Sequence, residues 1–392
     1  MGRGQSGLAQ TAKRSMKELQ DIVAAFAKAK NCGKTVAIAT IVKVSGSTYR
    51  RPGARMLITL EGERIGSISG GCLENDVFER AQQVIASGKP MLVNYDTTSD
   101  NDIVWGLGLG CKGMVQVLIE RLTPENEFSP MTFLAECLHR RQVGILATIF
   151  HIEGQIKAPV GTHLMLHQDG TIFTNLEDAD LSADILQDAR EVLDKNCSLF
   201  KAYPLRGGKI EVFLEAIAPP VSLVIFGAGD DAIPVVRLAK ELGWYVTLID
   251  SRSANATSTR FPSADEVIVS RPEAIRETVE IDNRTVAVVM THNYLHDLEI
   301  LKILLPSPVQ YLGILGPKRR TEQLLVELKE QGLKLTEAQL HRLHGPVGLD
   351  IGGDTPEAIA LSIVAEIHAV LANRSGGLLR KRQEPIHNRS TG

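Results

Sequence analysis

The feature that most constrains the fold is a strand, a glycine-rich turn, a helix and a second strand in direct succession. They occupy residues 222–250, and the turn reads FGAGDDA. Further β-branched segments at 266–269, 285–290 and 309–315 alternate with helix-like segments. Strands that are separated by helices run parallel in one sheet. We therefore expect a Rossmann-like, doubly wound parallel-sheet domain over 221–374, in a chain of the α/β class.

The turn itself resembles a dinucleotide-binding turn. Gly227 and Gly229 fill the first two glycine positions, and Asp250 ends the next strand, where an acidic residue would bond a ribose hydroxyl. Two aspartates follow Gly229 at the predicted helix N-terminus, where they would compete with a pyrophosphate. The turn leaves two alternatives open: a bound nucleotide or dinucleotide, or a Rossmann sheet that binds something else or nothing.

Two polar groups follow later strands of the same domain. Lys318 and Arg319 come just after Gly316, where the next helix begins, so they form either a solvated basic face or an anion site at the sheet edge. His292 and His296 are four residues apart, but no third metal ligand accompanies them. For these histidines we expect capping and loop hydrogen bonds.

The N-terminal half contains an internal repeat. Segments of about 34–122 and 142–216 share a strand–loop–hairpin–helix order, and equivalent residues are 108 positions apart. Three glycine pairs follow this spacing: Gly46 with Gly154, Gly53 with Gly161, and Gly62 with Gly170. We therefore expect a duplicated α+β domain over 14–218, with flexible tails at 1–13 and 375–392.

Two cysteines distinguish the first copy. Cys72 lies in SISGGCLEND, before a predicted helix at 73–87, and Cys111 lies in GLGLGCKG. The second copy has Asp180 in place of Cys72 and, roughly, Arg206 in place of Cys111. Because the second copy keeps the scaffold without either thiol, the difference favours chemistry in the first copy.

The surroundings of Cys72 suggest a reactive or metal-binding thiol. A thiol at a helix N-terminus can ionise near neutral pH, and a thiolate suits a soft metal–sulfur centre or sulfur exchange. Gly70 and Gly71 leave the backbone in front of it open. The neighbouring loop carries three arginines, Arg50, Arg51 and Arg55. They could hold a phosphate; the alternative is a buried cysteine beside three surface arginines.

Composition excludes several other classes of protein. The 392 residues carry a formal charge of −3, which gives no general attraction to nucleic acid or to an anionic membrane. No apolar run reaches the ~18 residues of a membrane span. We expect no secretory signal either, because the first residues carry charge but no apolar segment. Five cysteines without a C-x-x-C pair fit a reducing, cytoplasmic location. Three of them look like packing residues: Cys32, Cys137 and Cys197.

The motifs together resemble the XdhC/CoxI family, the accessory proteins of xanthine dehydrogenase and related molybdenum hydroxylases. The N-terminal resemblance rests on ATIVKVSGSTYRRPGARMLI, GSISGGCLEND and LGLGCKG. The C-terminal resemblance rests on LVIFGAGDDA, VTLIDSR, VVMTHNYLHDLEIL, YLGILGPKRR and GPVGLDIGGDTPEAIALSIVAEI. The turn departs from the family's usual GAGHVG at Asp230, Asp231 and Ala232, which weakens the case for a nucleotide there.

The resemblance implies an accessory protein that binds molybdenum cofactor (molybdopterin) and assists its sulfuration and insertion. Its partners would be an apo xanthine dehydrogenase-type hydroxylase and a cysteine-desulfurase-like sulfur donor, and it would form a homodimer. On this hypothesis Cys72 and Cys111 lie near the molybdenum, and arginines of the 50–55 loop lie near the phosphate.

Two rival hypotheses remain. The Rossmann-like domain could make the chain an NAD(P)-dependent oxidoreductase, or the chain could be a scaffold that docks the hydroxylase without binding cofactor. No G-x-S-x-G, H-E-x-x-H or Walker motif occurs, and no nucleophile has an adjacent general base. We therefore expect a cofactor chaperone rather than a catalyst.

Overall fold

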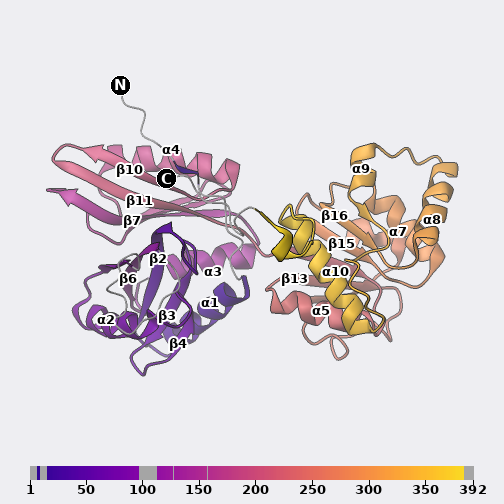
Figure 1. The fold of residues 1–392 in the computed structure, drawn as a ribbon, viewed down its shortest axis with the longest axis horizontal. Coiled ribbons are helices and arrows are strands. Elements are labelled where there is room, and N and C mark those ends of the chain that lie inside the picture. The colour runs from indigo at the N-terminus through magenta and orange to yellow at the C-terminus, as the bar shows by residue number, and fades with distance from the viewer. Residues whose placement is uncertain (1–6, 9–15, 97–112, 127, 157, 384–392) are drawn as a thin grey trace. The chain divides into compact units, whose positions relative to one another are not determined.

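A computed structural model describes residues 7–8, 16–96, 113–126, 128–156 and 158–383 (Figure 1). The chain forms two compact units that divide between Pro219 and Pro220. Among the described helices, none is both long and apolar enough to cross a membrane.

The first copy of the N-terminal unit is an antiparallel sheet with one helix on its face. After α1 (Met16–Asn31) the elements are β2 (Val36–Gly46), β3 (Arg55–Thr59), β4 (Arg64–Gly66), α2 (Glu74–Ser87), β5 (Met91–Asp96) and β6 (Gly113–Leu122). The strands lie in the order β4-β3-β2-β6-β5. Alternate residues of β2 and β3, among them Ala37, Ala39, Met56 and Ile58, pack under α2.

The second copy repeats this arrangement. Its elements are α3 (Pro130–Arg140), β7 (Gly144–Gly154), β8 (Thr162–His167), β9 (Ile172–Thr174), α4 (Ala179–Lys195), β10 (Leu199–Leu205) and β11 (Gly208–Ile217). The order β9-β8-β7-β11-β10 is that of the first sheet, with the short β1 (Gly7–Leu8) added beyond β10. Each long strand carries a β-bulge at the same place, at Val42 in β2 and at Phe150 in β7, 108 positions apart. These shared features support the duplication.

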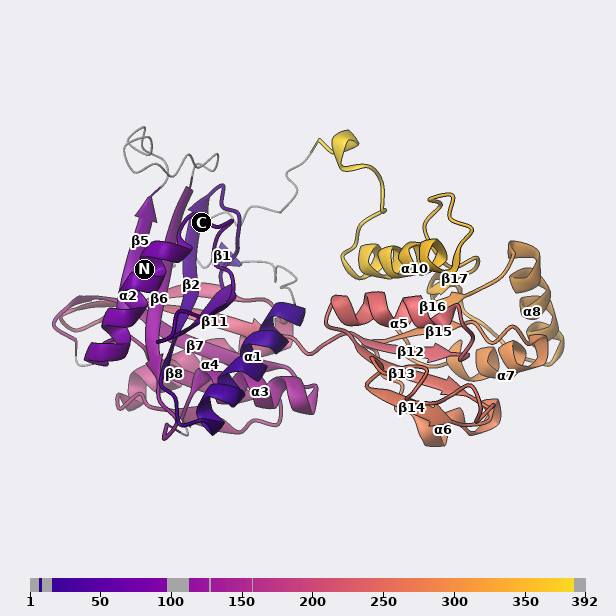
Figure 2. The ribbon, with the colours of Figure 1, turned by 90° about the horizontal axis from the view of Figure 1, so that it is seen from below.

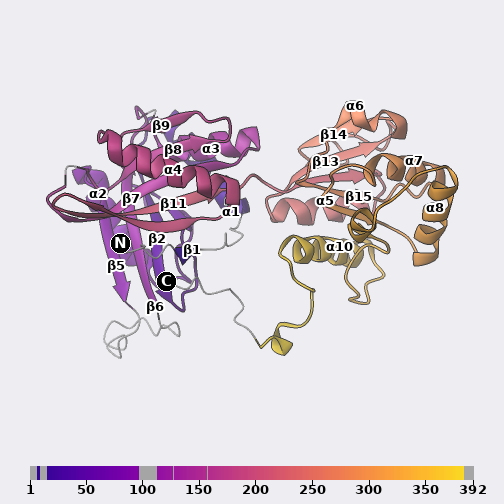
Figure 3. The same ribbon diagram turned by 90° about the horizontal axis from the view of Figure 1, so that it is seen from above.

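The two sheets pack face to face. Helices α2 and α4 cover their outer faces, whereas α1 and α3 pack against inner-face residues such as Leu57 and Met165. In Figure 1, α2 and α4 lie on opposite sides of the paired sheets, and Figure 3 shows α4 lying across its own sheet. The bulged residues Val42 and Phe150 meet between the sheets together with Leu118 and Phe213. Both residues keep the inward alternation of the strand before them, and the bulge reverses it only afterwards, so that Val44 and Ile152 pack on the outer faces. The N-terminal unit therefore has four main layers, α2, the two sheets and α4, with α1 and α3 packed against the inner faces of the sheets.

Two buried ion pairs connect the copies reciprocally. Arg55 of β3 binds both carboxylate oxygens of Glu215 in β11, at 2.7 and 2.5 Å. His163 of β8, which is equivalent to Arg55, lies 2.8 Å from Glu120 of β6. The side chains of Arg55 and Glu215 are only 4% and 1% exposed. Each copy thus supplies a base to the other copy's glutamate across the interface between the sheets.

The C-terminal unit is a six-stranded parallel sheet. Its strands are β12 (Ser222–Phe226), β13 (Tyr245–Asp250), β14 (Glu266–Val269), β15 (Thr285–Val289), β16 (Tyr311–Ile314) and β17 (Leu343–His344). The strands lie in the order β14-β13-β12-β15-β16-β17. The chain adds strands first to one side of β12 and then, from β15 on, to the other side, as in Rossmann sheets. The predicted α/β class and the Rossmann-like sheet are confirmed.

Helices cover both faces of this sheet. They are α5 (Ala232–Glu241), η2 (Pro272–Ala274), α6 (Ile275–Thr278), α7 (Tyr294–Leu304), α8 (Lys318–Glu330), α9 (Glu337–His341), α10 (Pro356–Leu371) and η3 (Leu379–Lys381). One face packs against α5 and α10 and the other against α7 and α8 (Figure 2). Helix α10 begins as its sequence predicts, with Thr355 as N-cap and Pro356 in the first turn.

Candidate functional site

The loop that carries Cys72 differs from its counterpart in the second copy. Helix α2 begins at Glu74, one residue later than predicted, so Cys72 lies two residues before the helix. Gly71 has a φ of +110°, which a side chain would strain and which is incompatible with a helix that begins at residue 71. Helix α4 begins at Ala179, the equivalent of Gly71, and therefore includes Asp180. Cys72 thus lies in an irregular loop.

The amides in front of α2 are already paired within the protein. The Ser69 hydroxyl accepts hydrogen bonds from the N–H groups of Gly71, Cys72 and Leu73, at 3.2, 3.1 and 3.1 Å. The Glu74 carboxylate accepts from the Ser69 N–H at 2.8 Å and from the Ser69 hydroxyl. Burial would raise the pKa of Glu74, but the hydrogen bonds from Ser69 outweigh burial and hold it below the usual value. The Glu74 side chain thus turns back onto the loop before α2. Its carboxylate occupies the helix N-terminus, where the sequence predicted the thiolate of Cys72.

Cys72 nevertheless lies where a ligand can approach. Its side chain is half-buried against the cluster under α2. A Cβ added at Gly71 would meet no atom within 4 Å, and Tyr49, which is 70% exposed, lies next to Gly70. The loop therefore leaves Cys72 partly exposed, next to a glycine with open space around it. Cys111, its predicted companion, lies outside the described residues.

The remaining cysteines behave differently from one another. Cys137 is buried, as predicted for a packing residue, and burial raises its pKa to about 12, so it stays protonated. Cys197 is half-buried. Cys32 is exposed, so the prediction that it packs inside the protein is wrong. It follows directly on α1, where the chain leaves the helix at the surface.

The three arginines of the neighbouring loop do not form one cluster. Arg50 binds both carboxylate oxygens of Glu18 in α1, at 2.5 and 2.7 Å. Arg55 is buried with Glu215 between the sheets and has no access to a phosphate. Arg51 is half-buried and forms no ion pair with any residue in the described part of the chain. The prediction that Arg55 binds a phosphate is therefore wrong. Arg55 belongs to the buried strand β3 and not to the surface loop before it.

The glycine-rich turn of the C-terminal unit approaches β15 closely. A Cβ at Gly227 would lie 2.3 Å from the carbonyl oxygen of Met290, and Gly227 has a φ of +118°. Asp250 is buried and accepts from the Ala228 N–H at 2.7 Å and from the Arg252 Nε and Nη2, at 2.9 and 2.7 Å. Burial would raise the pKa of Asp250, but these hydrogen bonds hold it below the usual aspartate value. Arg252 and the turn thus occupy the oxygens that a ribose would need.

Two ion pairs hold the acidic residues of the turn. Asp231 lies 2.7 Å from the Nε2 of His292, and Asp230 lies 2.6 Å from a guanidinium nitrogen of Arg260. Helix α5 begins at Ala232, so both aspartates lie at its N-terminus, as predicted. Gly229 lies beside them; a Cβ there would meet the Asp231 carboxylate at 2.4 Å. The hydrogen-bonding role expected for His292 agrees with this contact.

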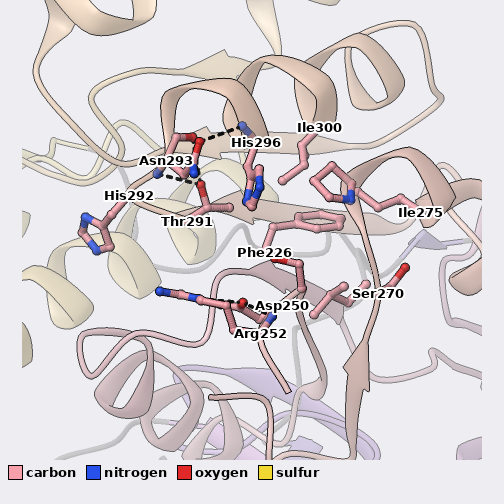
Figure 4. A pocket seen from close by; sticks show the side chains of 13 residues that line it. Phe226, Asp250, Arg252, Ser270, Ile275, Thr291, His292, Asn293, His296 and Ile300 are labelled. Atoms are coloured by element: carbon pink, nitrogen blue, oxygen red, sulfur yellow. Dashed lines mark hydrogen bonds and ion pairs between the residues drawn. The ribbon is translucent and has the colours of Figure 1, made fainter. Parts of the chain in front are cut away.

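A cavity of about 190 Å³ opens beside this turn (Figure 4). It lies at the carboxyl ends of four strands and is lined by Phe226, Ile249, Asp250, Ser251, Arg252, Ser270, Pro272, Ile275, Thr291, His292, Asn293, His296 and Ile300. Lys318 and Arg319 are exposed in the first turn of α8 and do not line it. Within the described ranges, no group of three or more His, Cys, Asp or Glu side chains could hold a metal ion.

The fold and these sites define a class of two-domain protein, with an N-terminal unit made of two similar copies, one of which carries Cys72 in its loop, and a Rossmann unit. Comparisons with protein families agree. The XdhC Rossmann domain matches residues 223–367, and the XdhC and CoxI family matches 29–96 and 137–203. The starts of the last two segments are 108 residues apart, the spacing of the repeat. The chain belongs to the XdhC and CoxI family.

Individual relatives cover most of the chain. A Bacillus subtilis protein, named as a probable subunit of xanthine dehydrogenase, is 36% identical over 330 residues, 84% of this chain and 91% of that protein. The Escherichia coli "Molybdenum cofactor insertion chaperone PaoD" is 22% identical over 86% of this chain and 84% of its own. A Bacillus halodurans crystal structure described as a xanthine dehydrogenase has a TM-score of 0.73 and 29% identity, covering 93% of this chain and 98% of that one.

Proposed function

We propose that this protein binds molybdenum cofactor as cargo and assists its sulfuration and insertion into a xanthine dehydrogenase-type hydroxylase. The observation that carries the proposal is the loop of the first copy, where the half-buried Cys72 follows Gly71 and the open space around that glycine. The names of the Bacillus subtilis and Escherichia coli relatives support the same role.

Three features of this loop and the neighbouring loop match a sulfur-rich anionic ligand: the cysteine sulfur, the glycines and Arg51. A cysteine sulfur is a soft donor, which matches a molybdenum–dithiolene centre. The glycines allow a bulky ring system to approach the backbone. Arg51 can supply positive charge to a phosphate without breaking an ion pair among the described residues. The redox chemistry of the cofactor would belong to the client hydroxylase, and this chain would hold and shield the cargo.

The proposal names two partners, the apo-hydroxylase and a cysteine-desulfurase-like sulfur donor. A partly accessible thiol is what sulfur exchange with such a donor requires. Cys111, the second predicted sulfur, and assembly as a homodimer in the cytoplasm remain part of the proposal. An enzymatic role in sulfuration is not needed, because the donor supplies the sulfur.

The test measures retained cargo. The full chain is mixed with released molybdopterin under anaerobic conditions and gel-filtered, and pterin and molybdenum are measured in the protein fraction. We expect Cys72→Ser to lose most of the retained cofactor and Cys72→Ser/Cys111→Ser to lose at least as much. Cys32→Ser, a matched change of an exposed cysteine, should retain it. Equal cofactor in all four proteins would contradict the role of the thiols, and none in wild type would favour the scaffold hypothesis.

A further inference from the structure

The C-terminal cavity combines an apolar interior with a polar rim. Phe226, Ile249, Ile275 and Ile300 are each no more than 3% exposed and form its interior. Polar groups come from the strand ends and from α7: Arg252, Ser270, Thr291, Asn293 and His296. This composition is typical of sites that enclose a flat organic ring and orient it through a few hydrogen bonds.

The side chain of His296 is available to such a ring. It projects from the first turn of α7 toward Phe226, and no hydrogen bond of its imidazole is found among the described residues (Figure 4). His292, by contrast, lies at the rim and is bonded to Asp231. One ring nitrogen of a neutral imidazole donates and the other accepts, so His296 can pair with the polar edge of a heterocycle.

The size of the cavity limits what it encloses. About 190 Å³ corresponds to roughly six water molecules at ~30 Å³ each and lies below the ~300 Å³ of small ligand pockets. The cavity therefore has room for one ring system, and the rest of the ligand would lie outside it. Arg252 lies at that exit with 53% of its side chain exposed, held in orientation by Asp250.

The charges beside the cavity oppose a dinucleotide. In a Rossmann fold the pyrophosphate lies over the glycine-rich turn at the N-terminus of the first helix. Here that position carries Asp230 and Asp231, and Pro234 removes one N–H from the first turn of α5. Arg260 offsets the charge of Asp230, whereas Asp231 is paired with an imidazole rather than with a permanent cation. Two phosphates at this turn would meet negative charge.

We infer that this cavity binds the base of a nucleoside monophosphate, with its phosphate directed to Arg252, and that Asp231 excludes dinucleotides. His296 positions the base, and Asp250 orients Arg252 instead of holding a ribose. The inference is independent of cofactor binding by the N-terminal unit, because no residue of the Cys72 loop takes part. Of the alternatives that Gly227, Gly229 and Asp250 left open, it favours a nucleotide over a dinucleotide.

Calorimetric titration of the full-length chain tests the inference with AMP, GMP, CMP, UMP and NADH. We expect at least one monophosphate to bind, with NADH weaker by about tenfold or more. His296→Ala should weaken the monophosphate about tenfold, and His296→Phe, which fills the space, should abolish binding. Asp231→Asn should strengthen NADH about tenfold, whereas Asp282→Asn, at the amino edge of β15, should leave both ligands unchanged.

Several outcomes would overturn the inference. One is tighter binding of NADH than of every monophosphate, and another is no binding of any monophosphate. A third is unchanged monophosphate binding by the His296→Ala and His296→Phe variants, provided that both unfold at the wild-type temperature. Cofactor retention by the same preparations is measured separately. A failure of the nucleotide site therefore remains distinguishable from a failure of the proposed chaperone function.

Discussion

The two copies of the N-terminal unit share a scaffold and differ in one loop. Both have the same strand order, and both carry a bulge at the same position of their central strand. In the second copy the helix begins at Ala179, capped by Asp178, and no thiol is present at the equivalent of Cys72. In the first copy the helix begins three residues later, at Glu74, and Cys72 lies in a loop after Gly71, whose φ is +110°. The comparison teaches that the fold needs neither the glycines nor the thiol, so their presence in one copy calls for a functional explanation.

The copies also differ in the ion pairs that join them. One interface glutamate faces the guanidinium of Arg55 and the other faces the imidazole of His163. A guanidinium stays charged when it is buried, whereas an imidazole can be neutral. The two equivalent positions should therefore respond unequally to mutation.

The largest effect is expected from breaking the arginine pair. Arg55→Ala would leave the carboxylate of Glu215 buried without its bidentate partner, which costs about 3–5 kcal/mol. Urea unfolding followed by circular dichroism would measure the loss. The double variant Arg55→Met/Glu215→Leu should recover most of it, because the unpaired charge is gone. If Arg55→Ala unfolds at the wild-type urea concentration, the pair does not hold the copies together.

The equivalent change in the other pair should cost less. His163→Ala removes one hydrogen bond to Glu120 and one to Thr148. The side chain of Glu120 is 12% exposed, against 1% for Glu215, so its unpaired carboxylate is better hydrated and we expect a loss of about 1–3 kcal/mol. The same urea experiment would compare the two variants directly. A loss for His163→Ala as large as that for Arg55→Ala would show that the pairs are energetically alike.

Gly71 offers a way to make the first copy resemble the second. Gly71→Ala places a side chain at a φ of +110°, which costs about 1–2 kcal/mol because the left-handed region strains any residue with a Cβ. A Cβ at this position would meet no other atom within 4 Å, so the loss would come from backbone strain and not from a clash with a neighbouring residue. Thermal unfolding would measure the loss, with Ala179→Gly in the second copy as the reverse control. No change in either protein would mean that the helix start does not depend on the glycine.

A smaller effect is expected from Ser69, and it should depend on pH. Ser69→Ala removes a hydroxyl that serves three amides and the Glu74 carboxylate, which costs about 1 kcal/mol at neutral pH. Because the pKa of Glu74 is lowered in the folded state, its contribution is present at neutral pH and is lost as pH falls through that lowered pKa. The difference between wild type and variant, followed by urea unfolding, should shrink in acid. If the difference in unfolding free energy does not change with pH, the effect of Ser69→Ala does not act through the Glu74 carboxylate.

Much of this architecture follows from sequence pattern alone. Alternating β-branched segments and helices predict the parallel sheet, and β14 lies at 266–269, as predicted. Glycines 108 residues apart predict the shared hairpins. Both signals are local or periodic, so a single sequence carries them.

The failures concern contacts between residues far apart in the chain. Arg55 looks like its neighbours Arg50 and Arg51, yet its partner Glu215 is 160 residues away. Asp250 carries the expected acid at the expected strand end, but Arg252 and the turn occupy its oxygens. Inward alternation along β3 is the one signal that could have identified Arg55 as buried, since it follows the same face as Leu57.

The central claim is that the Cys72 loop touches the cargo. Alkylation of Cys72 by iodoacetamide, followed by peptide mass spectrometry, tests it in protein with and without bound molybdopterin. We predict that cargo slows labelling of Cys72 about tenfold and leaves the exposed Cys32 unchanged. Equal labelling of Cys72 in loaded and cargo-free protein would contradict the account.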